Sequence, residues 1–293
     1  LIDAPHLGKI PSDWNLTKIG QLIDGIESGV SVNGEDRPAS DSEYGILKIS
    51  AVTSGVFKPT ENKLILDAEK HRAKTNPKPD SIIISRCNTP ELLGASAYIS
   101  KAYPHLFLPD KLWQTIPKKD IKIDMRWLAY YLASDFSRFR LTNLATGTSS
   151  SMCNITQGEL LNIPIPVPSY REQQSISLLL STWDRAIEIT EALIAAKEQR
   201  KQALMQRLLT GKVRFREFIK SHEKRRTHYY DLPADWKYLP IGKQAKEVSA
   251  KNKKGGALPV LSCTKHAGLV DSLAYLYTLR GSPLWPSESM RDQ

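Results

Sequence analysis

Residues 170–209 contain neither glycine nor proline, and this stretch constrains the fold more than any other feature of the chain. Ser169 and Glu172 have the spacing of a helix N-terminal capping box, and Gly211 is the residue type that commonly ends a helix. A helix over the whole stretch would be about 60 Å long, which exceeds the width of a small domain. We therefore predict a long helix within residues 169–211 that is not contained in one globular core.

The apolar residues of this helix recur at alternating steps of three and four, in a pattern interrupted by Thr190, Lys197 and Lys201. Such spacing places them on one face, and a long helix with an apolar face is stabilised by packing against another helix. We favour a coiled-coil contact over the alternative, a core helix of the adjoining domain. This apolar stripe consists of Leu180, Trp183, Ile187, Ile194, Leu204 and Leu208.

The chain before this helix, residues 1–168, has the pattern of a mixed α+β domain. Strand-like runs occur at 45–50, 81–85, 95–100 and 112–117, separated by Gly, Pro, Asn and Asp. A single helix is expected from Met125 to residue 144, with Asp124 as its N-cap. Thr156 and Glu159 have the spacing of a second capping box, which predicts a second, shorter helix. Alternate prolines at 162–169 predict an extended edge segment, because proline cannot donate to a sheet ladder.

The beginning of the domain recurs late in the chain at a constant offset of 222 residues. Further on, Gly55 corresponds to Gly268, and the likeness fades after Val270. We therefore divide the chain into a first domain (1–168), a long helix (169–211), a basic linker (212–231) and an incomplete second copy of the domain (232–293). The five repeated residues are Pro11, Asp13, Trp14, Ile19 and Gly20, which return as Pro233, Asp235, Trp236, Ile241 and Gly242.

The chain is basic, with a formal net charge of +10 and a pI near 9.4. Such a charge slightly favours a polyanionic partner, usually nucleic acid, over a merely solubilising surface. No apolar run is long enough to cross a membrane and the first residues do not resemble a signal peptide, so we expect a cytoplasmic protein. Three widely separated cysteines argue against a disulfide framework or a zinc site.

Motifs for catalysis are largely missing from the sequence. We find no phosphate-binding P-loop, no nucleophile elbow, no His-Glu-x-x-His metal site and no Asn-Pro-Pro-aromatic motif of adenine methyltransferases. Asp110, Asp120 and Lys122 fit a permissive pattern of Mg²⁺-dependent nucleases, which leaves a stand-alone nuclease as an alternative. Asp110 and Lys111 fit better as the start of the strand at 112–117.

Two polar loops have residue types suited to DNA contact. Loop 85–96 presents Arg86, Asn88 and Thr89 directly after an apolar strand, and Arg and Asn can recognise guanine and adenine edges. The alternative for this loop is an ordinary turn in which Asn88 and Thr89 bond the local backbone. Loop 145–156 is small, polar and rich in hydroxyl groups, so it can approach a phosphate backbone or serve as a flexible connector.

Several ordered segments together resemble the specificity subunits of type I restriction–modification systems. They are "IPSDWNLTKIG", "RCNTPELLGAS", "LPDKLW", "GTSSSMCNITQGELLNIPIPVPSYREQQSI" and "RLLTGKVRF". The resemblance implies two α+β target-recognition domains that each read one half of a split DNA sequence. Two long antiparallel helices would fix the distance between the halves. It further implies a non-catalytic subunit that docks adenine-N6 methyltransferase subunits and restriction subunits.

The resemblance also assigns roles to individual residues. Cofactors (S-adenosylmethionine, ATP and Mg²⁺) are expected on the partner subunits and none on this chain. Because only the first recognition domain and helix are complete, we hypothesise that two chains pair antiparallel; a remnant that binds the methyltransferase without selecting DNA is the alternative. The implied DNA-binding residues are Arg86, Asn88, Thr89, Lys111, Gly147, Thr148, Ser149 and Ser150, and the implied partner-binding residues are Gln173, Gln174 and the apolar stripe.

Overall fold

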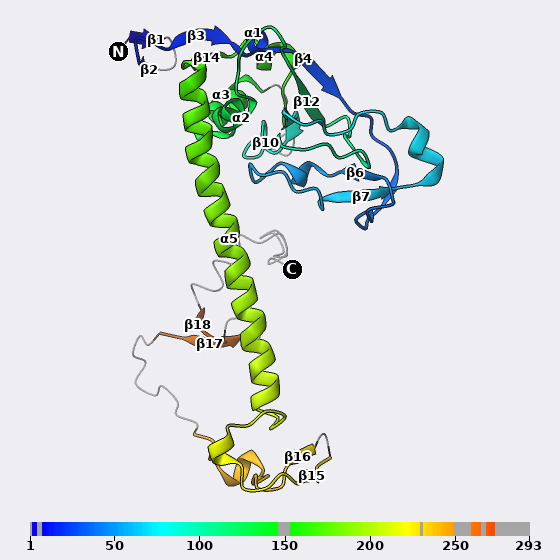
Figure 1. Ribbon diagram of the computed structural model, residues 1–293, viewed down its shortest axis with the longest axis vertical. Coiled ribbons are helices and arrows are strands. Elements are labelled where there is room, and N and C mark those ends of the chain that lie inside the picture. Colours follow the sequence, from blue (N-terminus) through cyan, green and yellow to red (C-terminus); the bar gives the residue numbers. More distant parts are fainter. Residues whose placement is uncertain are drawn as a thin grey trace, which may run out of the picture. The chain divides into compact units, whose positions relative to one another are not determined.

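The computed structural model describes residues 2–4, 8–145, 153–228, 231–248, 259–264 and 268–272 (Figure 1). The chain divides into two compact units, residues 1–201 and 202–293. Helix α5 (Tyr170–Leu208) belongs mostly to the first unit and ends in the second. Within the described residues, no helix combines the length and apolar character needed to cross a membrane.

A four-stranded antiparallel sheet forms the centre of the first unit, in the order β10 (Ser96–Ile99), β8 (Ser81–Ser85), β12 (Leu112–Pro117) and β4 (Ile23–Ser28). The three isoleucines of β8 are at most 1% exposed. Ile82 and Ile84 face one hydrophobic cluster and Ile83 faces another. An unbroken apolar run is what a strand covered on both faces requires.

The two faces of this sheet are covered by different elements. Helices α2 (Met125–Ala133) and α3 (Asp135–Leu144) contribute Leu128 and Leu141 to the cluster with Ile82. Leu47 and Leu108 pack on the side of Ile83. Leu47 belongs to a second sheet, ordered β11 (Leu106–Phe107), β6 (Gly45–Leu47), β7 (Asn62–Ile65) and β5 (Gly34–Glu35). Short 3-10 helices, η1 (Ile49–Ala51) and η2 (Asp67–Arg72), complete this region.

The single helix predicted from Met125 to residue 144 is wrong, because Ser134 divides it into α2 and α3. Ser134 has an extended backbone (φ −64°, ψ 147°), and its hydroxyl accepts a hydrogen bond from the Ser137 N–H at 3.3 Å. Serine is a good N-cap because its side chain replaces a missing backbone acceptor. The predicted N-cap of α2 is confirmed, since Asp124 Oδ1 accepts from the Trp127 N–H at 2.8 Å.

The proline-rich segment is confirmed as an edge strand. Among the described residues, strand β14 (Pro164–Val167) pairs only with β3 (Asn15–Lys18), in a two-stranded antiparallel sheet. The capping box of α4 (Gln157–Leu161) is also confirmed: the Glu159 N–H donates to Thr156 Oγ1, and the Thr156 N–H donates to Glu159 Oε2. Helix α1 (Ile19–Leu22) packs near α4, and the hairpin β1 (Ile2–Ala4) and β2 (Gly8–Ile10) begins the described chain.

The long helix predicted after Ser169 is confirmed as α5, which contains 39 residues and extends for roughly 58 Å. The Glu172 N–H donates to Ser169 Oγ at 3.3 Å, as an N-cap requires. At the other end, Gly211 adopts a left-handed φ of +70°, and its N–H donates to Leu208 O at 3.2 Å. Glycine is favoured there because a left-handed backbone is strained for other residues.

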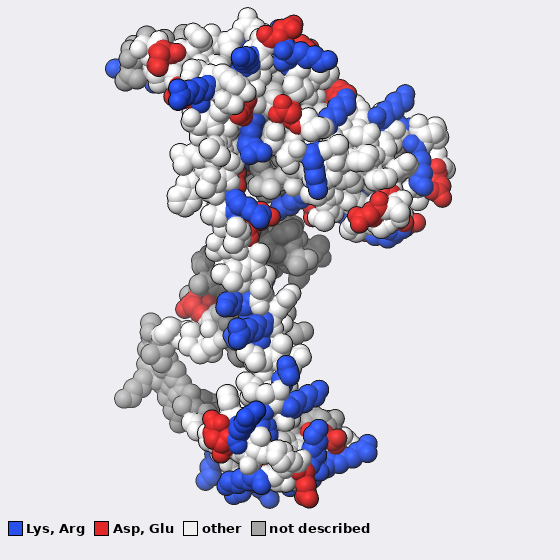
Figure 2. All heavy atoms as spheres, in the orientation of Figure 1, with Lys and Arg blue, Asp and Glu red and all other residues white. Residues whose placement is uncertain are grey.

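The second unit begins with a hairpin, β15 (Lys224–Arg226) and β16 (Asp231–Pro233), flanked by η3 (Arg216–Phe218) and η4 (Ile241–Lys243). A further hairpin joins β17 (Leu261–Thr264) to β18 (Gly268–Asp271). Residues 202–248 contain eleven Lys and Arg against five Asp and Glu. Basic side chains accordingly cover much of this unit's face in Figure 2.

The repeat seen in the sequence has a structural counterpart. Strand β15 lies at the same offset of 222 residues from β1, and each strand forms the first arm of a hairpin. The Trp14 N–H donates to Pro11 O at 3.2 Å, and the Trp236 N–H donates to Pro233 O at 3.1 Å. Gly55 and Gly268 both have left-handed φ angles, +78° and +69°. The two segments therefore share local conformation as well as residues.

Candidate nucleic-acid interface

The two polar loops singled out in the sequence meet in the structure. Strand β9 (Cys87–Asn88) lies in loop 85–96 and pairs with β13 (Cys153–Asn154), which lies in loop 145–156. The Ile155 N–H also donates to Arg86 O at 3.0 Å. These bonds join segments far apart in the chain into one surface. Gly147, Thr148, Ser149 and Ser150 lie outside the described residues, although β13 follows them closely.

Arg86 and Lys111 lie together where β8 ends and β12 begins. Ser85 is paired with Leu112, and the Arg86 N–H donates to Lys111 O at 3.1 Å. The Arg86 Nε–H donates to Asp110 O at 2.8 Å, and Nη2 lies 3.6 Å from Asp110 Oδ2. The Arg86 side chain is 34% exposed. Because a guanidinium has five N–H donors, it keeps donors for another acceptor.

Asn88 and Thr89 form the local turn that was the alternative reading of this loop. Asn88 Oδ1 accepts from the Thr89 N–H at 2.9 Å, and Thr89 O accepts from the N–H groups of Leu92 and Leu93. Both residues are half-buried. The Asn88 side-chain amide NH2 group takes no part in the turn bond, and base recognition by this loop stays a prediction.

Helix α3 contacts and supports loop 85–96. Arg138 donates to Glu91 O, and the Thr142 hydroxyl donates to Pro90 O at 3.2 Å. Leu141 is fully buried and touches Gly94, which has a left-handed φ of +71°. A Cβ on Gly94 would lie 2.6 Å from Leu141 Cδ1. The position of the loop therefore depends on a glycine at this site.

We expect Gly94→Ala to destabilise the first unit by about 1–3 kcal/mol, because it combines a strained backbone with overpacking against Leu141. Urea unfolding followed by circular dichroism would measure the change. Two glycines provide controls: Gly25, which has free space and an ordinary φ, and Gly55, which has a left-handed φ without a neighbour. A Gly94→Ala loss no larger than that of Gly55→Ala would contradict the clash.

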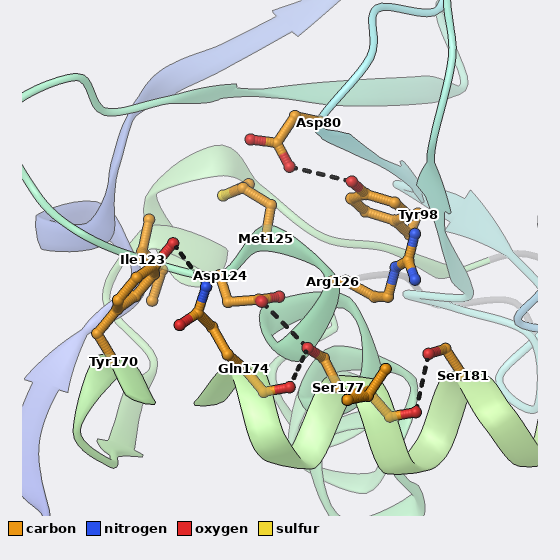
Figure 3. Close-up of a pocket in the computed structure, with 11 residues that line it drawn as sticks. Asp80, Tyr98, Ile123, Asp124, Met125, Arg126, Tyr170, Gln174, Ser177 and Ser181 are labelled. Carbon is orange, nitrogen blue, oxygen red and sulfur yellow. Dashed lines mark hydrogen bonds between the residues drawn. The ribbon is translucent and has the colours of Figure 1, made fainter. Parts of the chain in front are cut away.

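A polar joint fixes the start of α5 to the domain, and Figure 3 shows the part formed by Asp124 and Ser177. Gln173, only 2% exposed, accepts from the Asp124 N–H through Oε1 at 2.9 Å and donates through Nε2 to Pro168 O at 2.9 Å. The Ser177 hydroxyl donates to Asp124 Oδ2 at 3.0 Å. Asp124 therefore caps α2 and holds α5 at the same time.

This joint corrects the partner-binding role expected for Gln173, because a buried amide with both ends bonded inside the chain has no surface left for a partner. Gln174, by contrast, is exposed. The sequence did not reveal Ser177 or the second role of Asp124. The only available signal was the polar pair at 173 and 177, one helical turn apart.

A cavity of about 370 Å³ lies beside the joint, between the start of α2 and α5. Tyr98 donates its hydroxyl to Asp80 Oδ1 at 3.1 Å, and the Arg126 guanidinium lies 4.9 Å from the centre of the Tyr98 ring. Burial raises the pKa of both Asp80 and Tyr98 above their ordinary values. Figure 3 shows these side chains facing Gln174 and Ser177 across the cavity.

We expect Asp124→Ala to cost about 1–2 kcal/mol of unfolding free energy through the lost N-cap alone, and more through the broken joint. Ser177→Ala should cost less, because it removes one bond and leaves the cap. Chemical denaturation would measure both. Asp120→Ala is the matched control, since Asp120 is exposed and lies just before the same helix. Equal effects at 120 and 124 would refute the joint.

The apolar stripe of α5 is largely uncovered. The Tyr130 hydroxyl donates to Asp184 Oδ2 at 2.5 Å, and residues beyond this bond point mostly to solvent. Burial, with the Asp184 hydrogen bond, raises the pKa of Tyr130. The exposed fractions along the stripe are 37% for Leu180, 65% for Trp183, 55% for Ile187, 54% for Ile194 and 42% for Leu204, and Leu208 is half-buried.

Comparison with known proteins identifies the family. A family profile described as "Type I restriction modification DNA specificity domain" matches residues 11–199, which include both polar loops and most of α5. The chain belongs to the type I specificity family. The predicted resemblance and the α+β fold class with a long helix are thereby confirmed.

Curated relatives in the type I specificity family agree with this assignment. A putative MjaX specificity subunit from Methanocaldococcus jannaschii is 24% identical over 93% of this chain and 64% of its own length. The MjaVIII specificity subunit of the same organism is 31% identical over 71% of this chain and 48% of its own length. The EcoEI specificity subunit of Escherichia coli is 24% identical over 55% of this chain and 27% of its own length. The chain therefore spans less than two thirds of the length of these relatives.

Solved specificity subunits also resemble the chain. The subunit from M. genitalium has a TM-score of 0.49 and 19% identity, covering 68% of this chain and 47% of that one. The subunit from Thermoanaerobacter tengcongensis has a TM-score of 0.41 and 15% identity, covering 69% of this chain and 46% of that one.

The geometry of this type I specificity domain does not favour the nuclease alternative. Asp110 precedes β12 and Asp120 follows it, so a six-residue strand separates them by roughly 20 Å. Two carboxylates that share a metal ion must lie within a few ångströms of it. No cluster of three or more metal-ligating side chains occurs among the residues that the structure describes.

Proposed function

We propose that this chain is a DNA-specificity component that reads one half of a split target in double-stranded DNA and has no catalytic activity of its own. The observation that carries the proposal is the pairing of β9 with β13. It joins a loop containing Arg86 and Asn88 to a hydroxyl-rich loop, beside Lys111. Segments with residue types suited to base reading and to phosphate binding are thus joined by backbone pairing.

The basic composition of the chain supports a DNA partner in general terms. Lysine and arginine that neutralise phosphates contribute binding that is independent of sequence and sensitive to salt. Residues 202–248 carry a marked excess of such side chains, several of them visible in Figure 2. We assign selectivity to the loop surface of the first unit and non-selective attraction to these basic residues.

Family membership further suggests partners. An adenine-N6 methyltransferase subunit would supply S-adenosylmethionine chemistry, and a restriction subunit would supply ATP- and Mg²⁺-dependent cleavage. Gln174 and the exposed part of α5 are the surface that we assign to protein partners. This chain would contribute the choice of target.

We further propose that two copies pair through antiparallel α5 helices. Five of the six apolar side chains on the stripe are 37–65% exposed. Apolar surface in contact with water is unfavourable, and packing against a second helix would bury it. An antiparallel arrangement of identical helices is symmetric, so the same residues meet on both sides. Two paired copies would present two identical loop surfaces, which suits a palindromic split target.

Co-expression with a type I methyltransferase subunit, followed by mapping of N6-methyladenine in the host genome, tests this function. A bipartite palindromic motif is the expected result. An asymmetric split motif would show that another specificity chain completes the reader and would contradict the pairing of two copies. Methyltransferase that co-purifies without any methylated motif would show a remnant that binds the enzyme without selecting DNA.

A further inference from the structure

The segment that follows α5 encloses a single carboxylate. Arg214 donates through Nη1 and Nη2 to both oxygens of Asp235, at 2.8 and 2.9 Å. The Lys220 N–H donates to Asp235 Oδ2 at 3.1 Å. The side chains of Arg214 and Asp235 are only 12% and 11% exposed. We call residues 211–220 the clamp.

The clamp contacts more of its target than the carboxylate. The Arg214 guanidinium lies 5.7 Å from the centre of the Trp236 ring, a distance typical of a cation–π contact. Pro233 packs so closely on Gly211 that a Cβ there would lie 2.4 Å from Pro233 Cγ. The clamp thus recognises the proline, the aspartate and the tryptophan of one Pro-x-Asp-Trp turn, residues 233–236.

These three residues are the ones that the repeat preserves. The turn at residues 11–14 has the same Pro-x-Asp-Trp pattern and the same hydrogen bond from the tryptophan N–H to the proline carbonyl. A hairpin precedes each turn. Asp13 is exposed, and no hydrogen bond or ion pair engages its carboxylate in the described part of the chain. The first turn therefore presents the features that the clamp binds.

The first turn and the clamp are connected to opposite ends of the long helix. Asn15, which directly follows the first turn, is paired with Val167 at the end of β14, and α5 begins three residues later. The turn at 11–14 thus lies at the N-terminal end of α5. The clamp follows the C-terminal end of α5 in the chain. When two such helices pair antiparallel, the end of α5 that leads into each clamp comes beside the first turn of the other copy.

We propose that the clamp is a receptor for Pro-x-Asp-Trp turns with two occupants: the turn 233–236 of its own chain, and the turn 11–14 of a second copy. This inference rests on the proposed pairing of two chains. The internal turn lies close to the clamp in sequence, which gives it a high effective concentration. It therefore competes with the second copy, and the start of the second repeat limits how firmly the paired copies are held.

Chemical cross-linking between two differently marked chains tests the inference. One chain carries Ser12→Cys and the other Lys212→Cys, both with Cys263→Ser to remove the exposed native thiol. A short bismaleimide then joins turn and clamp only between chains. Lys212→Cys with Ala234→Cys in one chain calibrates the reach of the reagent, because Ala234 corresponds to Ser12.

Releasing the internal turn with Asp235→Ala in the clamp-bearing chain should raise the inter-chain yield at least fivefold. Adding Asp13→Ala to the other chain should abolish the gain. Because Asp235→Ala could destabilise the fold of the second unit, a charge exchange between the two chains provides an independent test. A chain with Arg214→Glu should cross-link to a chain with Asp13→Arg and not to one with native Asp13.

Sedimentation of the same samples tests the pairing of two chains separately from the binding of the turn by the clamp. If the mass is that of a pair but neither Asp235→Ala nor the charge exchange raises the inter-chain cross-linking yield, the clamp inference is overturned and the pairing stands. A single-chain mass for every mixture would overturn the pairing, and the inference with it. A paired mass with the expected gain, lost on Asp13→Ala, supports both.

Discussion

Ile187→Lys should convert the paired form of the chain into single chains, with a rise in the dissociation constant of about 100-fold or more. The Ile187 side chain is 55% exposed in the single chain and lies in the middle of the apolar stripe. Pairing would bury the rest of its surface, and burial of an isoleucine contributes about 1.5–3 kcal/mol. A lysine there loses that contribution and places a charge at the helix contact in each of the two copies.

Sedimentation equilibrium over a wide range of protein concentration would measure this change. Ile189→Lys is the matched control, because Ile189 has the same residue type and an exposed fraction of 54% but lies roughly 200° around the helix. It should leave the paired mass almost unchanged. Equal dissociation by both variants would show that the stripe is not the contact surface, and an unchanged mass for Ile187→Lys would refute pairing through α5.

The parts of the fold that could be predicted from the sequence are those fixed by local chemistry. The isoleucine run of β8, the capping residues Asp124 and Thr156, and the length of α5 each follow from propensity, capping or periodicity within one segment. The repeated Pro-x-Asp-Trp turn was visible for the same reason, since its conformation depends on four consecutive residues.

The break at Ser134 shows where local patterns fail. Apolar residues keep helical spacing on both sides of it, so periodicity alone favours one helix. Ser134 instead ends α2 and caps α3, and Leu141 of α3 packs on Gly94 of the polar loop. Packing between distant segments decided the outcome. Weak helix formers such as serine are the positions at which tertiary structure most easily overrides a continuous helix.

The sequence predicted the two loops of the candidate site but not their contact. Both polar loops stood out by their residue types, yet nothing in the chain indicated that they touch, because the strands that join them contain two residues each. Gln173 was misread for a related reason. A glutamine on a helix with an exposed apolar face is usually at the surface, and its burial depends on how α5 docks against Asp124.

Arg86→Ala should relax the preference for one base position of the target by about tenfold to hundredfold, because a bidentate contact to a base contributes about 1–3 kcal/mol of discrimination. Arg86 is held at the end of β8 by Asp110, so its side chain is placed before DNA arrives. Binding of the chain and its methyltransferase to a library randomised at each target position would measure the preference.

Lys101→Ala is the control for charge alone, because Lys101 is exposed and follows β10 at the opposite end of the sheet from Arg86. It should weaken binding evenly on all sequences, or leave it unchanged, since a phosphate contact carries no base information.

Asp110→Ala controls for the lost ion pair: it frees Arg86 without removing it and should retain the identity of the preferred base. An even loss of affinity on all sequences for Arg86→Ala would place the base-reading residues elsewhere. In that case Arg86 would be a phosphate contact, and its substitution would also reduce the salt dependence of binding.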